Sequence, residues 1–191
     1  MTIDSIILIS TAISATSCCV WNNFIKNNDN IYIDSLTGVN NRHFFQKIEE
    51  KEMSGNKYYV VFADIDFFKK VNDTYGHDSG DIVLKEFSRI LKQTVKNNSD
   101  YVVRWGGEEF VLFLKVSNKD IFTDKVLFKR INDLKDIIEK TTISADSFNI
   151  KITASFGLSI NTDIDLVSRI KEADKNLYMA KENGRNKVIM K

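Results

Sequence analysis

Two pairs of carboxylates stand next to apolar segments in this sequence, where they could hold a metal ion. Glu108 and Glu109 follow two glycines in YVVRWGGEEFVLFL, and Asp64 and Asp66 end the segment KYYVVFADID. Carboxylates clustered at the edge of a sheet repel one another strongly unless a cation neutralises them. Oxygen ligands without histidine or cysteine favour Mg²⁺, so the pattern predicts metal-assisted phosphoryl or nucleotidyl transfer. Taken singly, each acid is also typical of an ordinary solvated turn.

The elements that would bring these acids together are a β-hairpin and a central strand. Tyr101–Val103 and Phe110–Leu114 have the aromatic and β-branched composition of buried strands. Gly106 and Gly107 supply the backbone freedom that a tight turn between them requires. Residues 57–66 form a continuous apolar run that ends in acids, which predicts a central strand. If this strand lies beside the hairpin, its first acid lies close to the two glutamates.

The segment that follows the central strand offers groups that could bind a nucleotide. In FFKKVNDTYGHDSGD, residues 67–81, Gly76 and Gly80 fit a tight turn that lets a ligand approach the backbone. The amide of Asn72 and the carboxylate of Asp81 together suit the edge of a guanine base. The alternative is that these residues only form turns and helix N-termini, and their spacing leaves both interpretations open.

The remaining pattern predicts an α+β domain with one sheet packed against helices. Asp34 and Ser35 are typical N-cap residues, and a helix is predicted from them through Ile48. Apolar residues at helical spacing predict a second helix over residues 81–96. Further helices are predicted over residues 120–140 and 166–183, and a further strand over residues 149–160.

The composition is that of one ordinary globular domain. The chain has 191 residues, of which 43% are hydrophobic and 28% charged, so it can bury a proper core. Its net charge of +1 gives no electrostatic sign of a nucleic-acid partner. The two cysteines, Cys18 and Cys19, are adjacent and show no metal-binding spacing. The globular part carries no cysteine, which is compatible with a reducing cytosol.

The N-terminal residues 1–21 are predicted to be a membrane anchor. Ser5–Trp21 is an uncharged stretch of 17 residues, close to the lower limit for a spanning helix. Lys26 follows it, so the positive-inside rule predicts that the rest of the chain is cytoplasmic and tethered at the inner membrane. The alternative is an apolar helix that is buried or that pairs with a second copy. Residues 22–30 are typical of a linker, and the main domain is predicted over residues 31–191.

Five ordered blocks of the sequence resemble the signature blocks of GGDEF domains, the diguanylate cyclases. They are DSLTGVNNRHFF, VFADIDFFKKVNDTYGHDSGDIVL, VVRWGGEEF, ITASFGLSI and ADKNLYMAKENGRNKV, and the resemblance covers Ile31–Lys191. It implies a central, mostly antiparallel sheet flanked by helices, related to the palms of nucleotide cyclases and polymerases. It also implies that two GTP molecules are condensed into cyclic di-GMP, with release of two pyrophosphates, at the interface of a homodimer.

The resemblance implies that this chain has a metal site. The implied ligands of two Mg²⁺ ions, or of Mn²⁺, are Asp64, the backbone carbonyl of Ile65, Glu108 and Glu109. The same three acids are the implied catalytic residues, because they hold the metal and help to deprotonate the 3′-hydroxyl that attacks the α-phosphate.

Other matched positions are implied to bind GTP. Asn72 and Asp81 match the guanine-binding pair, and the aspartate favours guanine because relatives that accept ATP carry a serine there. The positions implied to hold the triphosphate are Lys69, Lys181 and Arg185. Gly106 and Gly107 are implied to let the α-phosphate lie against the hairpin backbone. His77 is assigned to the substrate-binding loop, where it is expected to shape the loop rather than to act as an acid or base.

The chain departs from the family pattern at a product-binding site. Many members carry an inhibitory RxxD motif before the glycine pair, and the matching stretch here is NNSD. Asp100 is present, whereas Asn97 stands where the arginine would be. Asparagine cannot make the bidentate contacts of arginine, so product inhibition through this site is not expected. His43 stands where a second arginine is common, and it is expected to be a surface residue.

The sequence is compatible with three functional hypotheses. The first is an active diguanylate cyclase that works as a homodimer. The second is a binding module that holds GTP or cyclic di-GMP without turnover. Degenerate family members usually lose the metal carboxylates or the guanine pair, and this chain keeps all of them. The third hypothesis is an inactive domain that dimerises with a partner.

Overall fold

The computed structural model describes residues 31–95, 98–116, 124–145 and 147–191. Residues 34–191 form one compact unit. The predicted membrane segment Ser5–Trp21, the predicted linker over residues 22–30, and Asn97 lie outside the described residues. Among the helices that the structure describes, none is long and apolar enough to cross a membrane.

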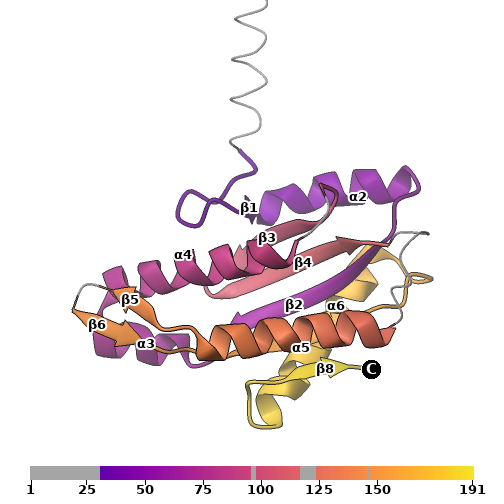
Figure 1. The fold of residues 1–191 in the computed structure, drawn as a ribbon. Coiled ribbons are helices and arrows are strands. Elements are labelled where there is room, and N and C mark those ends of the chain that lie inside the picture. Colours follow the sequence, from indigo (N-terminus) through magenta and orange to yellow (C-terminus); the bar gives the residue numbers. More distant parts are fainter. Residues whose placement is uncertain (1–30, 96–97, 117–123, 146) are drawn as a thin grey trace, which may run out of the picture. The chain divides into compact units, whose positions relative to one another are not determined.

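A six-stranded sheet in the order β1-β3-β4-β2-β7-β8 forms the centre of this unit (Figure 1). Its strands are β1 (Asn40–Asn41), β2 (Tyr58–Ile65), β3 (Tyr101–Gly106), β4 (Glu109–Lys115), β7 (Ala154–Ser159) and β8 (Val188–Met190). The four inner strands pair antiparallel, whereas β1 and β8 pair parallel at the two edges. A separate hairpin consists of β5 (Ile143–Ala145) and β6 (Phe148–Ile150). The predicted α+β fold with a mostly antiparallel central sheet is confirmed.

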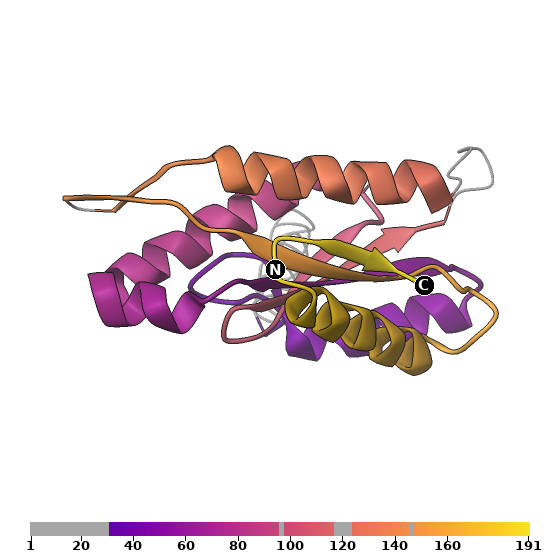
Figure 2. The same cartoon turned by 90° about the horizontal axis from the view of Figure 1, so that it is seen from below.

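Helices cover both faces of the central sheet. They are the 3₁₀-helix η1 (Arg42–Phe44), α2 (Phe45–Met53), α3 (Phe68–Tyr75), α4 (His77–Thr94), α5 (Asp124–Lys140) and α6 (Leu166–Glu182). Helices α4 and α5 lie on one side of the sheet, and α2 and α6 lie on the other (Figure 2). The short helix α3 lies at the end of the sheet toward which β2 runs, near the β5–β6 hairpin (Figure 1).

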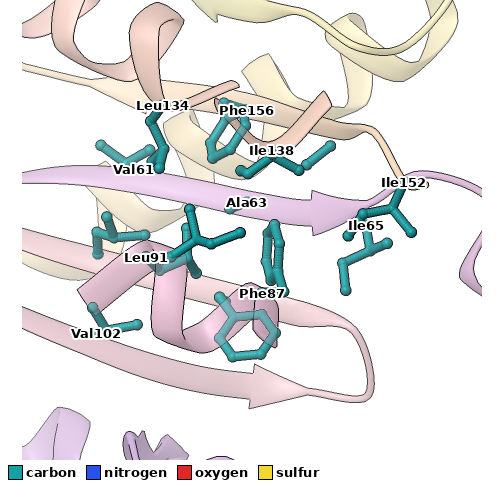
Figure 3. Close-up of a cluster of buried hydrophobic side chains, with 14 of the residues drawn as sticks. Val61, Ala63, Ile65, Phe87, Leu91, Val102, Leu134, Ile138, Ile152 and Phe156 are labelled. Carbon is teal, nitrogen blue, oxygen red and sulfur yellow. The ribbon is translucent and has the colours of Figure 1, made fainter. Parts of the chain in front are cut away.

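Strand β2 is buried on both faces, which explains its continuous run of apolar residues. Val61, Ala63 and Ile65 belong to the larger core, in which β2 meets α4 and α5 (Figure 3). Val60 and Phe62 belong to a second core that includes α2 and α6. Successive side chains of a strand alternate between its faces, so one strand serves both cores. The C-terminal end of β2 is therefore held from both sides.

Helix α6 packs against β7 with very close backbone contact. A Cβ atom added to Gly157 would lie 2.1 Å from the carbonyl oxygen of Ala173 and 2.1 Å from the amide nitrogen of Leu177. Glycine is required here because any side chain would push the helix off the sheet. Asn176 Nδ2 adds a buried hydrogen bond of 2.8 Å to a carbonyl oxygen of β7. These contacts position α6, whose last turn carries Lys181.

The helix predicted from Asp34 through Ile48 is wrong at its beginning. The chain forms turns and β1 first, and α2 starts only at Phe45. Asp34 accepts hydrogen bonds from the backbone N–H and the hydroxyl of Thr37, and it pairs with Arg104 at 3.1 Å. A short acidic side chain that bonds to its own loop competes with helix formation. Gly38, with φ of 65°, then turns the chain toward β1.

Residues 67–81, which are expected from the sequence to be a loop with a tight turn ahead of the helix 81–96, are mostly helical. Helix α3 ends at Tyr75 and α4 begins at His77, so Gly76, with φ of 84°, makes the turn between them. Helix α3 has eight residues and buries only Phe68 and Val71. So short an amphipathic pattern is too weak to stand out in the sequence.

The strand predicted over residues 149–160 is interrupted. Strand β6 ends at Ile150 and β7 begins at Ala154. Between them, the carbonyl oxygen of Thr153 accepts a hydrogen bond of 2.9 Å from the N–H of Asp66. Buried apolar residues continue at every second position through the break, so the periodicity of the sequence does not reveal it.

Candidate active site

The register of the sheet brings the predicted acids together at the end of β2. Asp64 stands opposite Glu109 in the pair β2–β4, and Gly106 of β3 stands opposite the same glutamate. Gly107 has a left-handed φ of 41° in the turn, and a Cβ atom added there would meet no atom within 4 Å. The hairpin turn therefore leaves room for a ligand against its backbone. The predicted hairpin and its position beside Asp64 are confirmed.

Burial and neighbouring negative charges make Asp64 and Glu109 hard to ionise. Burial raises the pKa of Asp64 to about 6; Lys181 opposes this shift, while Glu108 and Glu109 add to it. Burial also raises the pKa of Glu109, where Lys181 again opposes the shift and Asp174 and Glu108 add to it. A cation at this point would relieve the repulsion, so the site is electrostatically suited to bind one.

Lys181 supplies a positive charge to this cluster. Its Nζ atom lies 2.8 Å from Oδ2 of Asp64. Within the part of the chain that the structure describes, no three His, Cys, Asp or Glu side chains are gathered closely enough to hold a metal ion as they stand. The oxygen donors nevertheless fit a hard divalent cation, which would displace the ammonium group from Asp64. Ile65 ends β2, and because its side chain is a hydrocarbon it could offer a metal ion only its backbone carbonyl.

The two residues implied to bind guanine lie on neighbouring helices. Asn72 is on α3 and Asp81 is on α4. A Cβ atom added to Gly80 would lie 1.9 Å from Oδ1 of Asn72, so the glycine is what lets α4 approach this amide. Asp81, Lys69 and His77 are exposed on the same two helices. The structure thus brings Asn72 against the first turns of α4, which carry Asp81, and leaves the charged groups accessible to a ligand.

Arg185 lies in the turn after α6, over the start of α3. Its guanidinium carbon is 4.5 Å from the centroid of the Phe67 ring, which is a cation–π contact. Both residues have left-handed backbone conformations, with φ of 59° for Arg185 and 57° for Phe67. Lys181 lies one helical turn earlier in the chain, beside Asp64. Two of the three cations implied to hold the triphosphate, Lys181 and Arg185, therefore flank the end of β2.

One group of contacts at this end of the sheet was not predicted. Asp66 is buried, and its carboxylate accepts hydrogen bonds from the hydroxyls of Thr153 and Ser155 and from the N–H of Asn186. The available signal in the sequence was the pair of hydroxyl residues in the otherwise apolar segment ITASFG.

Asp100, the one residue of the RxxD motif that this chain keeps, makes structural contacts within the domain. It is buried, its Oδ1 accepts a hydrogen bond of 2.8 Å from the N–H of Lys115, and its Oδ2 lies 4.0 Å from the guanidinium of Arg130. His43 is exposed on η1, as expected for a surface residue.

The fold and this site together define an α+β domain with an acidic GGEEF hairpin. The chain belongs to the GGDEF family: the family model described as "Diguanylate cyclase, GGDEF domain" matches residues 31–187.

Two relatives that are similar to this chain are named diguanylate cyclases, and a third is named only as a membrane protein. Diguanylate cyclase A of Treponema denticola is 37% identical over 167 residues, which cover 82% of this chain and 43% of that protein. The probable diguanylate cyclase DgcT of Escherichia coli is 38% identical, over 83% of this chain and 35% of that protein. An uncharacterized membrane protein of Staphylococcus aureus is 33% identical, over 96% of this chain and 53% of that protein. The chain thus spans about half or less of the length of these relatives.

Solved structures have the same fold. The coiled coil and GGDEF domain of DgcB from Caulobacter crescentus, in complex with c-di-GMP, has a TM-score of 0.83 and covers 98% of this chain and 100% of that chain. Its identity is only 23%, so this likeness concerns the fold alone. Diguanylate cyclase SiaD of Pseudomonas aeruginosa, in complex with its activator SiaC, is 28% identical, with a TM-score of 0.74, and covers 96% of this chain and 73% of that chain.

Proposed function

We propose that this chain is a diguanylate cyclase, which condenses two GTP molecules into cyclic di-GMP and releases two pyrophosphates. The observation that carries the proposal is the register of β2 against the hairpin, which sets Asp64 opposite Glu109 and beside the Gly106–Gly107 turn. Membership of the GGDEF family and relatives named diguanylate cyclases support it.

The acidic cluster would hold two divalent ions, Mg²⁺ or Mn²⁺. The proposed ligands are Asp64, the backbone carbonyl of Ile65, Glu108 and Glu109. Such ions, when bound, offset the charge of the triphosphate and make the attacking hydroxyl more acidic. The raised pKa of Asp64 supports this assignment, because a buried acid with acidic neighbours becomes easier to ionise beside a cation.

The guanine base and the triphosphate have separate sets of proposed partners. Asn72 and Asp81 offer the amide and the carboxylate that pair with the guanine edge, and both lie on the α3–α4 pair. The cations proposed to bind the phosphates are Lys69, Lys181 and Arg185. His77 opens α4 and is proposed to shape this part of the substrate site.

The chemical step forms one bond and breaks another at the α-phosphate. The 3′-oxygen of one GTP attacks the α-phosphorus of the other, and the bond from that phosphorus to the bridging oxygen breaks, so that pyrophosphate leaves with the electron pair. Glu109 is suited to accept the proton of the 3′-hydroxyl, because burial raises its pKa above the usual value and so makes it a stronger base. Gly106 and Gly107 lack side chains that would hinder the approach of the phosphate to the hairpin.

A homodimer follows from the stoichiometry of this reaction. Each domain is proposed to hold one GTP, and both phosphodiester bonds form between the two nucleotides. Two active sites must therefore face each other, at least transiently, with the reacting groups aligned.

A membrane tether at Ser5–Trp21 is part of the proposal. It is supported by the length and lack of charge of this segment and by the Staphylococcus aureus relative, which is named a membrane protein and matches 96% of this chain. The catalytic domain would then lie on the cytoplasmic side.

The test is to incubate the purified protein with GTP and Mg²⁺ at several protein concentrations. We expect cyclic di-GMP and pyrophosphate, identified by chromatography and mass, at a rate that rises more steeply than linearly with protein concentration. GTP that stays intact even when two domains are joined by a fused dimerising helix would overturn the proposal in favour of a binding module. A linear dependence at all concentrations would contradict transient dimerisation.

A further inference from the structure

We propose that Asp66 is a positioning residue for the triphosphate site, because its carboxylate holds the turn 184–186 that carries Arg185. The inference rests on the proposed function, which gives Arg185 its role in binding phosphate.

Three distant segments of the chain meet at the Asp66 carboxylate, which is 4% exposed. Thr153 Oγ1 donates a hydrogen bond to Oδ2 at 2.8 Å, and Ser155 Oγ donates to Oδ1 at 2.7 Å. The backbone N–H of Asn186 donates to Oδ2 at 2.9 Å. Ionised aspartate accepts hydrogen bonds without donating any, so it can serve all three donors at once.

The turn after α6 needs a tertiary contact to keep its shape. Gly184, Arg185 and Asn186 have successive φ angles of 100°, 59° and 48°. The left-handed region is uncommon for residues other than glycine, and such residues persist where surrounding contacts determine their conformation. The N–H groups of Gly184 and Arg185 bond back to the last turn of α6. The bond from Asn186 ties this turn to Asp66, the residue that follows β2. One residue later, the carbonyl oxygen of Lys187 accepts a hydrogen bond of 2.8 Å from the N–H of Phe156 in β7, so the turn is also held on that side.

The same bond clamps the contact between Arg185 and Phe67. Asp66 directly precedes Phe67, and Asn186 directly follows Arg185, so the bonded residues adjoin the two members of the cation–π pair. Phe67 is 62% exposed, so little else in the described structure covers the outer side of its ring. Without the bond to Asp66, the backbone at Asn186 loses its hold beside Phe67 while Lys187 stays bonded to β7. The turn can then shift locally and move the guanidinium from its place beside the end of β2.

The role of Asp66 differs from that of a metal ligand. Its two oxygens are already used by protein donors, whereas Asp64, two residues earlier, faces Lys181 and the glutamates. We therefore expect that loss of the Asp66 carboxylate weakens the binding of GTP and leaves the chemistry of bound GTP largely unchanged.

The test compares Asp66→Asn with the wild-type full chain in three measurements, which are hydrogen exchange, the affinity for a GTP analogue and steady-state kinetics. Asparagine presents an amide NH₂ group to one of the donors, so the bond to the N–H of Asn186 weakens. We expect hydrogen exchange at this amide to accelerate about tenfold, and the affinity for a non-hydrolysable GTP analogue to fall about tenfold. The KM for GTP should rise by the same factor, while kcat changes less than about twofold. Asp163→Asn, which alters an exposed acid in a distant loop, is the matched control.

A double-mutant cycle with Arg185→Ala shows whether Asp66 acts through Arg185. We expect Asp66→Asn to cause no further loss of affinity when Arg185 is already alanine, because the two changes remove the same contact. Additive losses would overturn the inference. If Asp66→Asn does not fold, Thr153→Val and Ser155→Ala each remove one donor to the same carboxylate and take its place in the cycle.

The outcomes separate this inference from the proposed function. Faster exchange at Asn186 with unchanged affinity for the analogue would overturn the positioning role while the cyclase proposal stands. Unchanged hydrogen exchange at the Asn186 amide would also overturn the positioning role while the cyclase proposal stands. This exchange is measured without any nucleotide. A wild-type chain that binds no GTP analogue would overturn both.

Discussion

Asp64 and Asp66 are two aspartates at the end of one strand, and the structure treats them in opposite ways. Asp64 lies among acids, and burial raises its pKa to about 6 despite the ion pair with Lys181. Asp66 lies among neutral donors and accepts hydrogen bonds from Thr153, Ser155 and Asn186. Both residues are almost completely buried, with exposures of 5% and 4%.

The difference between the two aspartates shows how a carboxylate that binds a ligand can be distinguished from one that stabilises the fold. Asp64 keeps an electrostatic cost that a bound cation can relieve, which is typical of a functional site. The carboxylate of Asp66 has its hydrogen bonds already made within the fold, which is typical of a group that holds other parts in place. Burial alone does not distinguish the two, because the difference lies in their partners.

The largest expected effect is on catalysis at the acidic cluster. Glu108→Gln removes a carboxylate that is proposed to hold metal, and we expect the rate of cyclic di-GMP formation to fall at least about 100-fold. The measurement is product formation at saturating GTP and Mg²⁺. Glu50→Gln, on the exposed side of α2, is the control and should keep the full rate. A Glu108→Gln rate equal to wild type would contradict the proposed metal site.

The next effect is on stability. Replacing each of the two aspartates by asparagine should change the free energy of unfolding in opposite directions. Asp66→Asn should lower the free energy of unfolding by about 1–3 kcal/mol, because a buried donor loses its acceptor. Asp64→Asn should raise it by roughly 1–2 kcal/mol at pH 8 without metal, because it removes a buried charge that the fold disfavours.

The pH dependence of the Asp64→Asn effect follows from the pKa. The folded-state pKa of about 6 is above the usual aspartate value of 3.8, so the penalty is absent below about pH 4 and complete above about pH 6. Denaturant titrations of metal-free protein should therefore show the gain at pH 8 and little gain at pH 4. A variant that is less stable than wild type at pH 8 would mean that the ion pair with Lys181 outweighs the burial of Asp64.

A smaller effect is expected where Gly80 meets Asn72. The methyl group of Gly80→Ala would lie 1.9 Å from Oδ1 of Asn72, so the amide must rotate away while the helix remains intact. We expect the KM for GTP to rise roughly three- to tenfold with little change in thermal stability, since one hydrogen bond to the base is lost. In an Asn72→Ala background the same change should have no effect on KM. An effect of equal size in that background would mean that Gly80 acts on something other than the amide.

The last expected effect is on base preference rather than on the overall rate. Asp81→Ser removes the carboxylate proposed to accept the N–H groups of guanine, and we expect the ratio of kcat/KM for GTP over ATP to fall roughly tenfold. Competition between the two nucleotides, with products resolved by mass, measures this ratio. Unaltered exclusive use of GTP would remove Asp81 from the guanine site.

The two helices α3 and α4 show where prediction from the sequence stops. Asn72 and Asp81 were predicted as a guanine-binding pair, and the structure puts them on adjacent helices rather than in a loop. The role of Gly80 was assigned to a turn, whereas its actual constraint is the Asn72 amide packed against it. A glycine in the sequence indicates an unusual backbone conformation or a close contact. Which neighbouring residue makes that contact depends on the tertiary structure.

The sequence by itself determined the buried strand 57–66, the GGEEF hairpin, the final helix and the family, because apolar runs, paired glycines and ordered motifs are local signals. Only the tertiary structure decided that Asp64 faces Lys181 and that Asp66 ties the turn after α6 to the end of β2. These contacts join residues far apart in the chain, and they depend on strand register and left-handed backbone turns. Two aspartates separated by one residue are identical in sequence terms, and their different roles arise from what the fold brings to each of them.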